Sequence, residues 1–222
     1  MRFSDSYWLV VGLLVSLKMA GVVLVFALPL AVVIALLRLA PQRGLRAVGT
    51  VYVEGIRNVP LLAHLLFWYF GAPELLPDAW KERLYAGSFE FIAGAIALTL
   101  YAAAFMAEDI RSGIRAIPAV QFEAGRALGL GFAATMRHVV LPQALRITAP
   151  PLLSQTLNLW KDTSIATVIG VGELMYQAAR VESASFRSSE AFTFATVAYL
   201  TVSLAITGLA AWVHRRWPVR TL

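Results

Sequence analysis

This sequence of 222 residues lacks several features on which common protein functions depend. It contains no cysteine, which excludes a disulfide framework and a thiolate metal site. Its three histidines lie too far apart in the chain to suggest a ligand cluster. None of its three lysines follows a glycine, which excludes the Gly-x-x-x-x-Gly-Lys phosphate loop of ATPases. It also has neither a Gly-x-Ser-x-Gly nor a His-Glu-x-x-His motif. We therefore predict no metal site, no ATPase site and no enzymatic activity in this chain.

Charged residues are scarce as well. They make up 14% of the chain, whereas hydrophobic residues make up 59%, a combination that soluble domains rarely reach. The composition therefore predicts an integral membrane protein. A net charge of +6 would be compatible with nucleic-acid binding, but the distribution of this charge along the chain argues against it.

Apolar runs long enough to cross a bilayer recur along the chain. An α-helix rises about 1.5 Å per residue, so about 20 residues cross a hydrocarbon core of about 30 Å. Five runs meet or approach this length: residues 8–37, 48–70, 91–107, 144–171 and 191–213. The first run is too long for a signal peptide and is followed by Arg38 rather than by a cleavage site. We predict an all-α membrane protein with five transmembrane helices in a single domain, residues 1–222.

Two of these runs are irregular. The run at 48–70 includes Glu54 and Arg57, which we expect to pair because they lie three residues apart on a helix. The same run includes His64, for which we expect a packed position with a hydrogen bond to the backbone. The run at 144–171 is longer than one span needs and is interrupted by Pro150-Pro151 and by polar residues at 158–164. We predict a broken span that faces protein or water. Residues 73–90 are predicted to form an external loop with turns.

Basic residues are distributed unevenly between the segments that join these runs. With five spans the two termini lie on opposite sides of the membrane, and the side richer in basic residues is cytoplasmic. Eleven basic residues fall on one side: Arg38, Arg43, Arg46, Arg111, Arg115, Arg126, Arg137, Arg146, Arg215, Arg216 and Arg220. Five fall on the other: Arg2, Lys81, Arg83, Arg180 and Arg187. We predict a periplasmic N-terminus, a cytoplasmic C-terminus and a cytoplasmic loop at about residues 118–142. This topology explains the positive charge without a nucleic-acid partner.

The loop at 118–142 is both charged and helix-forming. Pro118 is well placed to open a helix, and Gly129 and Gly131 are expected to end it. A second helix is predicted over 132–140, and Pro142 is expected to break or redirect it. Two interpretations of this loop remain open on pattern alone: an interfacial amphipathic loop without a partner, or a docking element.

This loop resembles the Glu-Ala-Ala motif of the permease subunits of ATP-binding cassette (ABC) importers for polar amino acids. The motif runs Glu-Ala-Ala, three residues, Gly, and later a hydrophobic residue with Leu-Pro. Here it reads Glu123-Ala124-Gly125-Arg126-Ala127-Leu128-Gly129, followed by Val140-Leu141-Pro142. Gly125 replaces the usual alanine, which lowers helix propensity by up to about 1 kcal/mol, and we expect docking to survive the change.

The resemblance extends over almost the whole chain. It covers, in order, residues 12–17, 52–62, 107–114, 150–151, 158–164 and 169–174. The second block departs from the commoner Arg-Gly-Thr-Pro of the family, because Asn58 and Val59 stand in its middle.

The resemblance implies the transmembrane domain of a type I ABC importer in a bacterial inner membrane. It implies two permease subunits, identical or different, with a periplasmic solute-binding protein outside and two ATPase subunits inside. ATP and magnesium would be bound by the ATPase subunits, and this chain would hold no cofactor. The short helix of the loop would sit in a groove of the ATPase and move the spans. The predicted coupling residues are Gln121, Glu123, Ala124, Gly125, Arg126, Ala127, Gly129, Leu141 and Pro142.

Polar residues near the membrane interior are candidates for the substrate path. The predicted path residues are Arg57, Tyr101, Gln155, Asn158, Lys161, Asp162, Thr163 and Ser164. The resemblance leads us to expect an acidic side chain near Gln155 in relatives that carry cationic amino acids, whereas this chain has Gln155 with Lys161 nearby. Positive character without compensation favours an acidic or neutral substrate, and we predict glutamate or aspartate.

Two other functional classes are alternatives to an importer permease. One is a self-contained secondary transporter or channel formed by a dimer, which would move solute along an ion gradient without an ATPase. The other is a membrane-embedded enzyme or scaffold that holds a lipid beside Lys161 and Asp162. Uptake that depends on ATP inside a vesicle distinguishes the importer from both.

Overall fold

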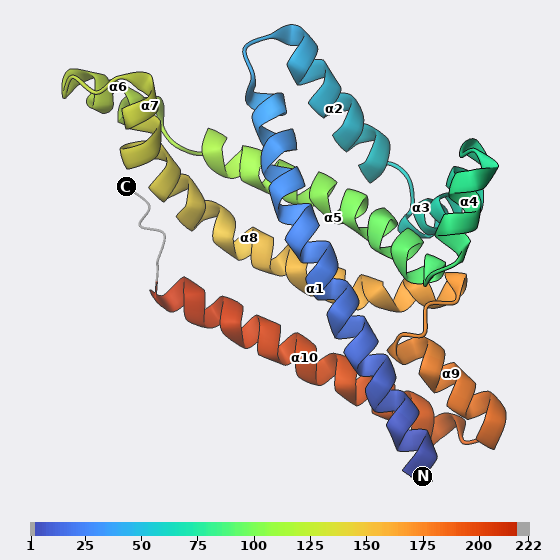
Figure 1. Ribbon diagram of the computed structural model, residues 1–222. Helices are drawn as coiled ribbons and strands as arrows, with labels where there is room; N and C mark the ends of the chain where they lie inside the picture. Colours follow the sequence, from blue (N-terminus) through green and yellow to red (C-terminus); the bar gives the residue numbers. More distant parts are fainter. Residues whose placement is uncertain (1–2, 217–222) are drawn as a thin grey trace.

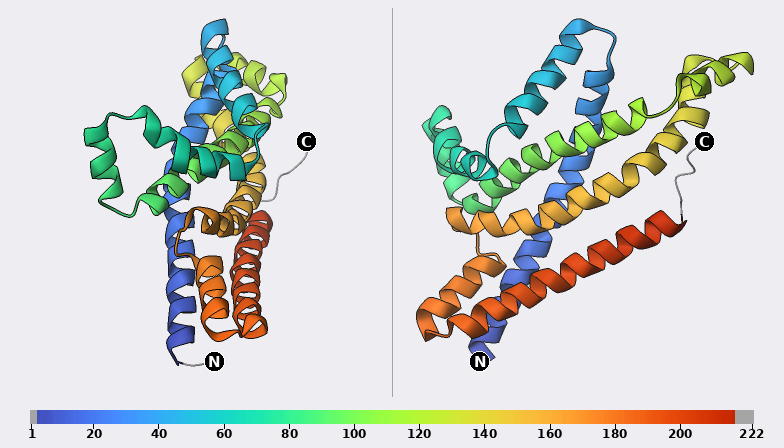
Figure 2. Two further views of the ribbon diagram at one scale, coloured as in Figure 1. Left: turned by 90° about the vertical axis from the view of Figure 1, so that its right-hand side faces the viewer. Right: turned by 180° about the vertical axis from the view of Figure 1, so that it is seen from behind.

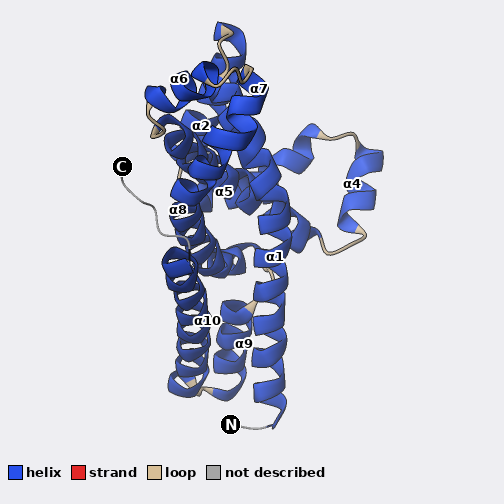
Figure 3. Ribbon diagram, turned by 90° about the vertical axis from the view of Figure 1, so that its left-hand side faces the viewer, coloured by secondary structure: helices blue, strands red, loops and turns tan. Residues whose placement is uncertain are grey.

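The computed structural model describes residues 3–216, and this part of the chain contains helices and no strands (Figure 3). The α-helices are α1 (Phe3–Leu39), α2 (Arg43–Arg57), α3 (Leu61–Leu66), α4 (Asp78–Tyr85), α5 (Phe89–Arg115), α6 (Ala119–Ala127), α7 (Phe132–Thr135), α8 (Leu141–Asp162), α9 (Leu174–Ser185) and α10 (Ser188–Arg216). Two π-helical turns, Phe67–Gly71 and Met136–Val140, and two 3₁₀ segments, Ala72–Leu75 and Thr163–Ile169, join some of them.

The main core lies where α1 crosses α5 (Figure 1). On α1 the fully buried residues Met19, Val23, Ala27 and Ala31 recur every four residues, which places them along one stripe. The facing stripe of α5 is rich in alanine and is also buried. Without a hydrophobic driving force in lipid, helices associate by close packing, and small residues allow the two backbones to approach.

Helices α5, α8 and α10 run side by side, with α8 in the middle, and α1 crosses this layer (Figures 1 and 2). Within the described residues, three helical segments are long and apolar enough to cross a membrane: Asp5–Leu39, Phe89–Arg115 and Ser188–Val213. The three correspond to the first, third and fifth predicted spans.

The second predicted span is not one helix. The run at 48–70 divides into α2 and α3, because Pro60 lacks a backbone N–H and the residue before it is biased away from helical geometry. Asn58 ends α2, and its side-chain amide donates to the Glu54 carbonyl at 2.7 Å. The chain then turns and starts again with Pro60 directly before α3.

The fourth predicted span is broken later than the prolines suggested. Helix α8 continues through Pro150 and Pro151, whose fixed φ is close to the helical value, and ends at Asp162. The break comes after the 3₁₀ segment Thr163–Ile169, where Gly170 takes a left-handed φ of 84°. The position of the break therefore depends on a glycine rather than on the two prolines.

Two helices were missed in the loops. The predicted turns at 73–90 contain α4, and the segment after the break forms α9. Leu174, Ala178 and Val181 of α9 are buried against Leu9 of α1 and the start of α10, so this helix has a small core of its own.

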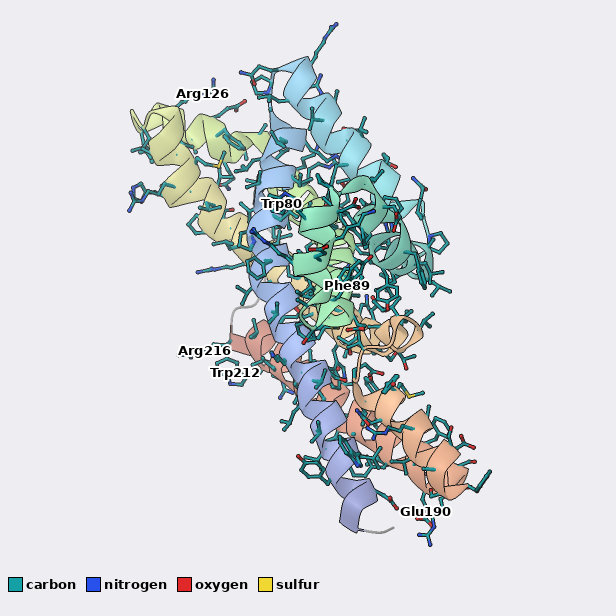
Figure 4. The ribbon with its side chains drawn as sticks, turned by 45° about the vertical axis from the view of Figure 1, so that its right-hand side comes forward. Trp80, Phe89, Arg126, Glu190, Trp212 and Arg216 are labelled. Carbon is teal, nitrogen blue, oxygen red and sulfur yellow. The ribbon has the colours of Figure 1, made fainter. Side chains whose placement is uncertain are left out.

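The described chain has two opposite ends. The N-terminal end of α1, α9 and the start of α10 lie at one end, and α6 and α7 lie at the other (Figures 1 and 2). Arg126 on α6 and Glu190 on α10 mark these two ends among the side chains (Figure 4). The loop at 118–142 is thus separated from the N-terminal end by the length of the helical layer.

Candidate functional site

A cavity of about 470 Å³ lies between α5 and α8, and we call it the central cavity. Its lining residues are Tyr101, Ala102 and Phe105 of α5 with Gln155, Asn158, Leu159, Lys161 and Asp162 of α8. Gln155, Asn158, Leu159 and Asp162 follow the i, i+3, i+4, i+7 spacing that places side chains on one face of a helix. The structure therefore brings together five of the eight predicted path residues. Their role in transport stays a prediction.

The other three predicted path residues lie around the central cavity rather than on its wall. The Arg57 guanidinium sits 4.9 Å from the centre of the Phe105 ring, which places a cation at the cavity's edge. The Thr163 hydroxyl is buried and donates to the Trp160 carbonyl at 2.8 Å. The Ser164 hydroxyl donates to the Lys161 carbonyl at 2.7 Å. These two hydroxyls donate to backbone carbonyls at the C-terminal end of α8, so they stabilise the end of this helix.

The central cavity carries charges of both signs. Lys161 and Asp162 line it, and Arg57 stands at its edge over Phe105. The His64 ring packs edge-on against the Tyr101 ring, with the two ring centroids 5.8 Å apart. His64 Nε2 lies 3.1 Å from the Ile56 carbonyl oxygen, which confirms its expected packed position with a backbone partner.

The expected pair between Glu54 and Arg57 is replaced by another arrangement. Glu54 lies 3.7 Å from Arg38 Nη2, and Arg38 also pairs with Glu108 on α5. Arg111 Nε donates to Glu108 at 3.0 Å, which completes a cluster of two arginines and two glutamates joining α1, α2 and α5. The cluster frees Arg57 to turn toward Phe105.

The loop at 118–142 folds as a helix, a glycine turn and a second helical piece. Pro118 stands directly before α6, and Gly129, with a φ of 76°, follows its end. Gln143 Nε2 donates to Gln121 Oε1 at 3.3 Å, and this bond ties α6 to α8. A small apolar cluster of Ile117, Val140 and Ala144, with Phe122 packed against it, holds the loop on the rest of the chain.

One face of this loop is open. Glu123, Ala124, Arg126, Ala127 and Gly129 are exposed, as are Leu141 and Pro142, whereas Gln121 is half-buried. The same face shows two large apolar side chains, Val120 and Leu128, the latter 77% exposed. Apolar residues exposed on a short helix beside charged ones are typical of a protein-binding surface.

Gly125 differs from its neighbours in being buried. A Cβ atom at this position would lie 2.5 Å from Thr135 Cγ2 and 2.6 Å from Thr135 Oγ1. The missing methyl group therefore affects packing as well as helix propensity, because Thr135 occupies the space that an alanine would need. That docking survives the change stays a prediction.

Pro142 does not break the chain's helical path, contrary to expectation. The π-helical turn Met136–Val140 precedes α8, and the Leu141 N–H bonds to the Met136 carbonyl five residues back. Pro142 then falls in the first turn of α8, where a missing N–H costs nothing. The wider turn thus lets α7 continue into α8.

A buried carboxylate at Glu173 was missed as a site. It accepts hydrogen bonds from the Tyr199 hydroxyl at 2.9 Å and the Ser16 hydroxyl at 3.2 Å, and it caps α9 by accepting from the backbone N–H groups of Met175 at 2.9 Å and Tyr176 at 2.7 Å. The available signal was an acidic residue between Gly172 and an apolar run, which is a common start of a helix.

Comparison with known proteins covers nearly the whole chain. A family described as "binding-protein-dependent transport system inner membrane component" matches residues 9–218. The chain is 38% identical over 187 residues to the probable glutamine ABC transporter permease protein GlnM of Bacillus subtilis, covering 84% of this chain and 82% of that protein. It is 33% identical over 213 residues to the glutamate/aspartate import permease protein GltJ of Escherichia coli, covering 94% and 87%. A crystal structure of an amino acid ABC transporter with histidines superposes with a TM-score of 0.84 at 30% identity, covering 95% of this chain and 94% of the other.

Proposed function

This chain belongs to the family of binding-protein-dependent transport system inner membrane components, as a permease subunit of an amino acid ABC importer, and we propose that its substrate is glutamate or aspartate. The substrate passes through the central cavity between α5 and α8. The permease named for glutamate and aspartate aligns with 94% of this chain, which supports the proposal.

The charges around the central cavity are the main support for an acidic substrate. Lys161 and Asp162 line the cavity, and Arg57 and Asp109 stand at its edge, where Asp109 is hydrogen-bonded to Gln155 and lies near Arg57. The cavity and its edge therefore present two positive and two negative groups. The proposal places the two carboxylates of glutamate or aspartate near Lys161 and Arg57 and the ammonium near Asp162. An arginine substrate has only one carboxylate for these two cations and would bring a guanidinium close to them, which is unfavourable for groups partly shielded from water.

The open face of the loop at 118–142 is the surface that contacts the ATPase. Permease subunits of this family work with separate ATPase subunits, and this chain has no phosphate-binding loop of its own. Glu123, Ala124, Arg126 and Ala127 form the contact, with Val120 and Leu128 supplying apolar area. ATP and magnesium are held by the ATPase, and this chain supplies only the mechanical connection.

A second permease subunit and a periplasmic solute-binding protein complete the importer. The central cavity is open at one side of this chain, and a partner around a two-fold axis would close it. The loop at 118–142 and the C-terminus face the cytoplasm, and the N-terminus faces the periplasm of a bacterial inner membrane. The second and fourth spans are then the pair α2 and α3 and the helix α8.

The test is uptake into proteoliposomes that hold this chain with its second permease subunit and its ATPase, with ATP inside and the binding protein outside. Excess unlabelled glutamate or aspartate should inhibit uptake of labelled glutamate, and excess arginine or histidine should not. Lys161→Gln should reduce uptake about tenfold, because a hydrogen bond to a charged group contributes about 1.5 kcal/mol. Lys81→Gln, which changes a lysine on α4 away from the cavity, should leave uptake unchanged.

Inhibition by arginine alone, or by glutamine alone, would overturn the acidic substrate. Equal uptake by the Lys161→Gln variant and the wild type would show that Lys161 does not contact the substrate. Uptake that follows an ion gradient without ATP would replace the importer by a secondary transporter.

A further inference from the structure

A second polar pocket, of about 490 Å³, lies at the start of α5 and shares no lining residue with the central cavity. Lys18 of α1 lines it together with Ser88, Glu90 and Phe91, and the segment 170–172 closes it from the other side. Lys18 interrupts the apolar run of α1, and its Nζ atom lies 5.2 Å from the centre of the Phe91 ring. Ionisable residues inside membrane spans are costly and are therefore candidates for function, and transport through the central cavity does not use this one.

An apolar groove of about 560 Å³ adjoins this pocket. It runs between α1 and α5 and is lined by Val22, Phe26, Leu30, Phe91, Ile92, Ala95, Ile96, Thr99 and Leu100. Phe91 lines both the pocket and the groove, which makes them neighbours. On α1 the residues Lys18, Val22, Phe26 and Leu30 recur every four positions, so a charged head and an apolar track lie on one face.

The groove faces away from the central cavity. On α5 Ile92 and Tyr101 are nine residues apart, and so are Ile96 and Phe105. Nine residues of an α-helix are two and a half turns, at about 3.6 residues per turn, so the two pairs point in opposite directions. A second permease subunit that closes the central cavity therefore leaves this groove to the lipid.

The dimensions of the groove match one leaflet of a bilayer. Lys18 and Leu30 are twelve residues apart on a helix, which is about 18 Å at 1.5 Å per residue. Half of a hydrocarbon core of about 30 Å is about 15 Å. An acyl chain that starts beside Lys18 thus ends near Leu30.

We infer that the pocket and groove bind a phospholipid with an ethanolamine headgroup. The phosphate contacts Lys18, the ammonium contacts Glu90, and one acyl chain lies in the groove. Lys18 and Glu90 do not form an ion pair with each other among the described ion pairs, so each is available to the lipid. The carboxylate disfavours an anionic headgroup such as phosphatidylglycerol, which Lys18 alone would accept.

The experiment is native mass spectrometry of the full chain co-purified with its ATPase in detergent. Phosphatidylethanolamine and phosphatidylglycerol with identical palmitoyl and oleoyl chains are added in competition. We expect the wild type to bind the ethanolamine lipid about two- to fivefold more tightly, the range that one partly exposed ion pair supplies. Glu90→Gln should abolish this preference, and Lys18→Gln should weaken binding of both lipids.

Two matched pairs of variants control for general effects. Ile96→Trp fills the groove and should weaken binding of both lipids, whereas Val25→Trp, at an exposed position of α1 outside the groove, should not. Lys81→Gln removes a lysine outside the pocket and should change neither lipid. The tryptophan pair keeps the test valid if a charge variant fails to fold.

Retention of the headgroup preference in Glu90→Gln would overturn the assignment of the headgroup. Equal lipid binding by Ile96→Trp and Val25→Trp would overturn the site itself. Because the chain has no cysteine, a disulfide formed between two copies that carry Ile96→Cys would show that a second copy, not lipid, covers the groove.

Discussion

At the scale of single residues, Glu173 joins three helices that are distant in sequence. Its carboxylate accepts from Ser16 on α1 and from Tyr199 on α10, and it caps α9 through two backbone N–H groups. Tyr199 in turn packs beside Trp160, whose indole N–H donates to the Tyr199 carbonyl. Four donors converge on this one buried carboxylate, so its removal would leave several buried donors without their acceptor.

Replacing this carboxylate is expected to lower stability. Glu173→Gln turns one accepting oxygen into a donor that faces other donors, at a cost of about 1 to 3 kcal/mol for each buried group left unsatisfied. For a chain of this size that corresponds to a fall in Tm of about 2 to 4 °C per kcal/mol. Thermal unfolding of the purified protein measures the change. Glu82→Gln, at an exposed position of α4, is the control and should not shift the Tm; an equal Tm for both variants would contradict the role of Glu173.

At the scale of elements, the loop at 118–142 is held by the close contact of α6 with Thr135. Gly125 and the Thr135 side chain lie against each other, so a larger side chain at either position would overlap the other residue. The loop's exposed face depends on this contact, because Val120 and Leu128 keep their positions only while α6 stays against the piece that follows it.

Gly125→Ala tests this contact. Alanine favours helices by about 1 kcal/mol over glycine, yet the new methyl group would overlap Thr135, so we expect ATPase co-purification and ATP-dependent uptake to fall. Thr135→Ala in the same chain removes two of the three close atoms and should partly restore both measurements. Gly131→Ala is the matched control, because a Cβ atom there meets nothing within 4 Å. A fully active Gly125→Ala variant would refute the steric explanation.

Sequence alone predicts the elements that depend on local pattern. The period of α8 places Gln155, Asn158 and Asp162 on one face, and Pro118 and Gly129 bound α6. It does not predict features that depend on contacts between distant residues. The Thr135 side chain limits the size of the residue that fits at position 125. The Glu54 side chain pairs with Arg38, which itself pairs with Glu108, and not with its neighbour Arg57. Pro142 misleads because a π-helical turn absorbs it, and no local propensity rule anticipates that turn.

At the scale of the whole molecule, the two ends differ in structure. One end holds α6 and α7, and the other holds α9 and the N-terminal end of α1 (Figure 2). Helix α10 is the least covered of the three apolar segments, because 6% of the residues in its most apolar 18-residue stretch are buried, against 56% in α5. Its exposed apolar face needs lipid or another subunit as surroundings.

The orientation of the two ends can be measured with single cysteines, because the chain has none of its own. Leu75→Cys and Leu128→Cys are well matched, since these side chains are 79% and 77% exposed. A membrane-impermeant maleimide added to intact cells should label position 75, and position 128 only after the membrane is permeabilised. The reverse pattern would invert the proposed topology, and labelling of both in intact cells would contradict a single crossing between them.

The continuity of α8 has a consequence for the order of events in a transport cycle. Leu141, at the end of the loop, and Asn158, in the central cavity, lie seventeen residues apart on α8, which is about 26 Å. Pro150 and Pro151 remove two backbone N–H donors within this stretch, but no turn or loop interrupts it, so motion at one end passes to the other through continuous helical backbone. Movement of the ATPase and the change in cavity shape should therefore be simultaneous. The time courses of the two, measured separately, should show no lag between them.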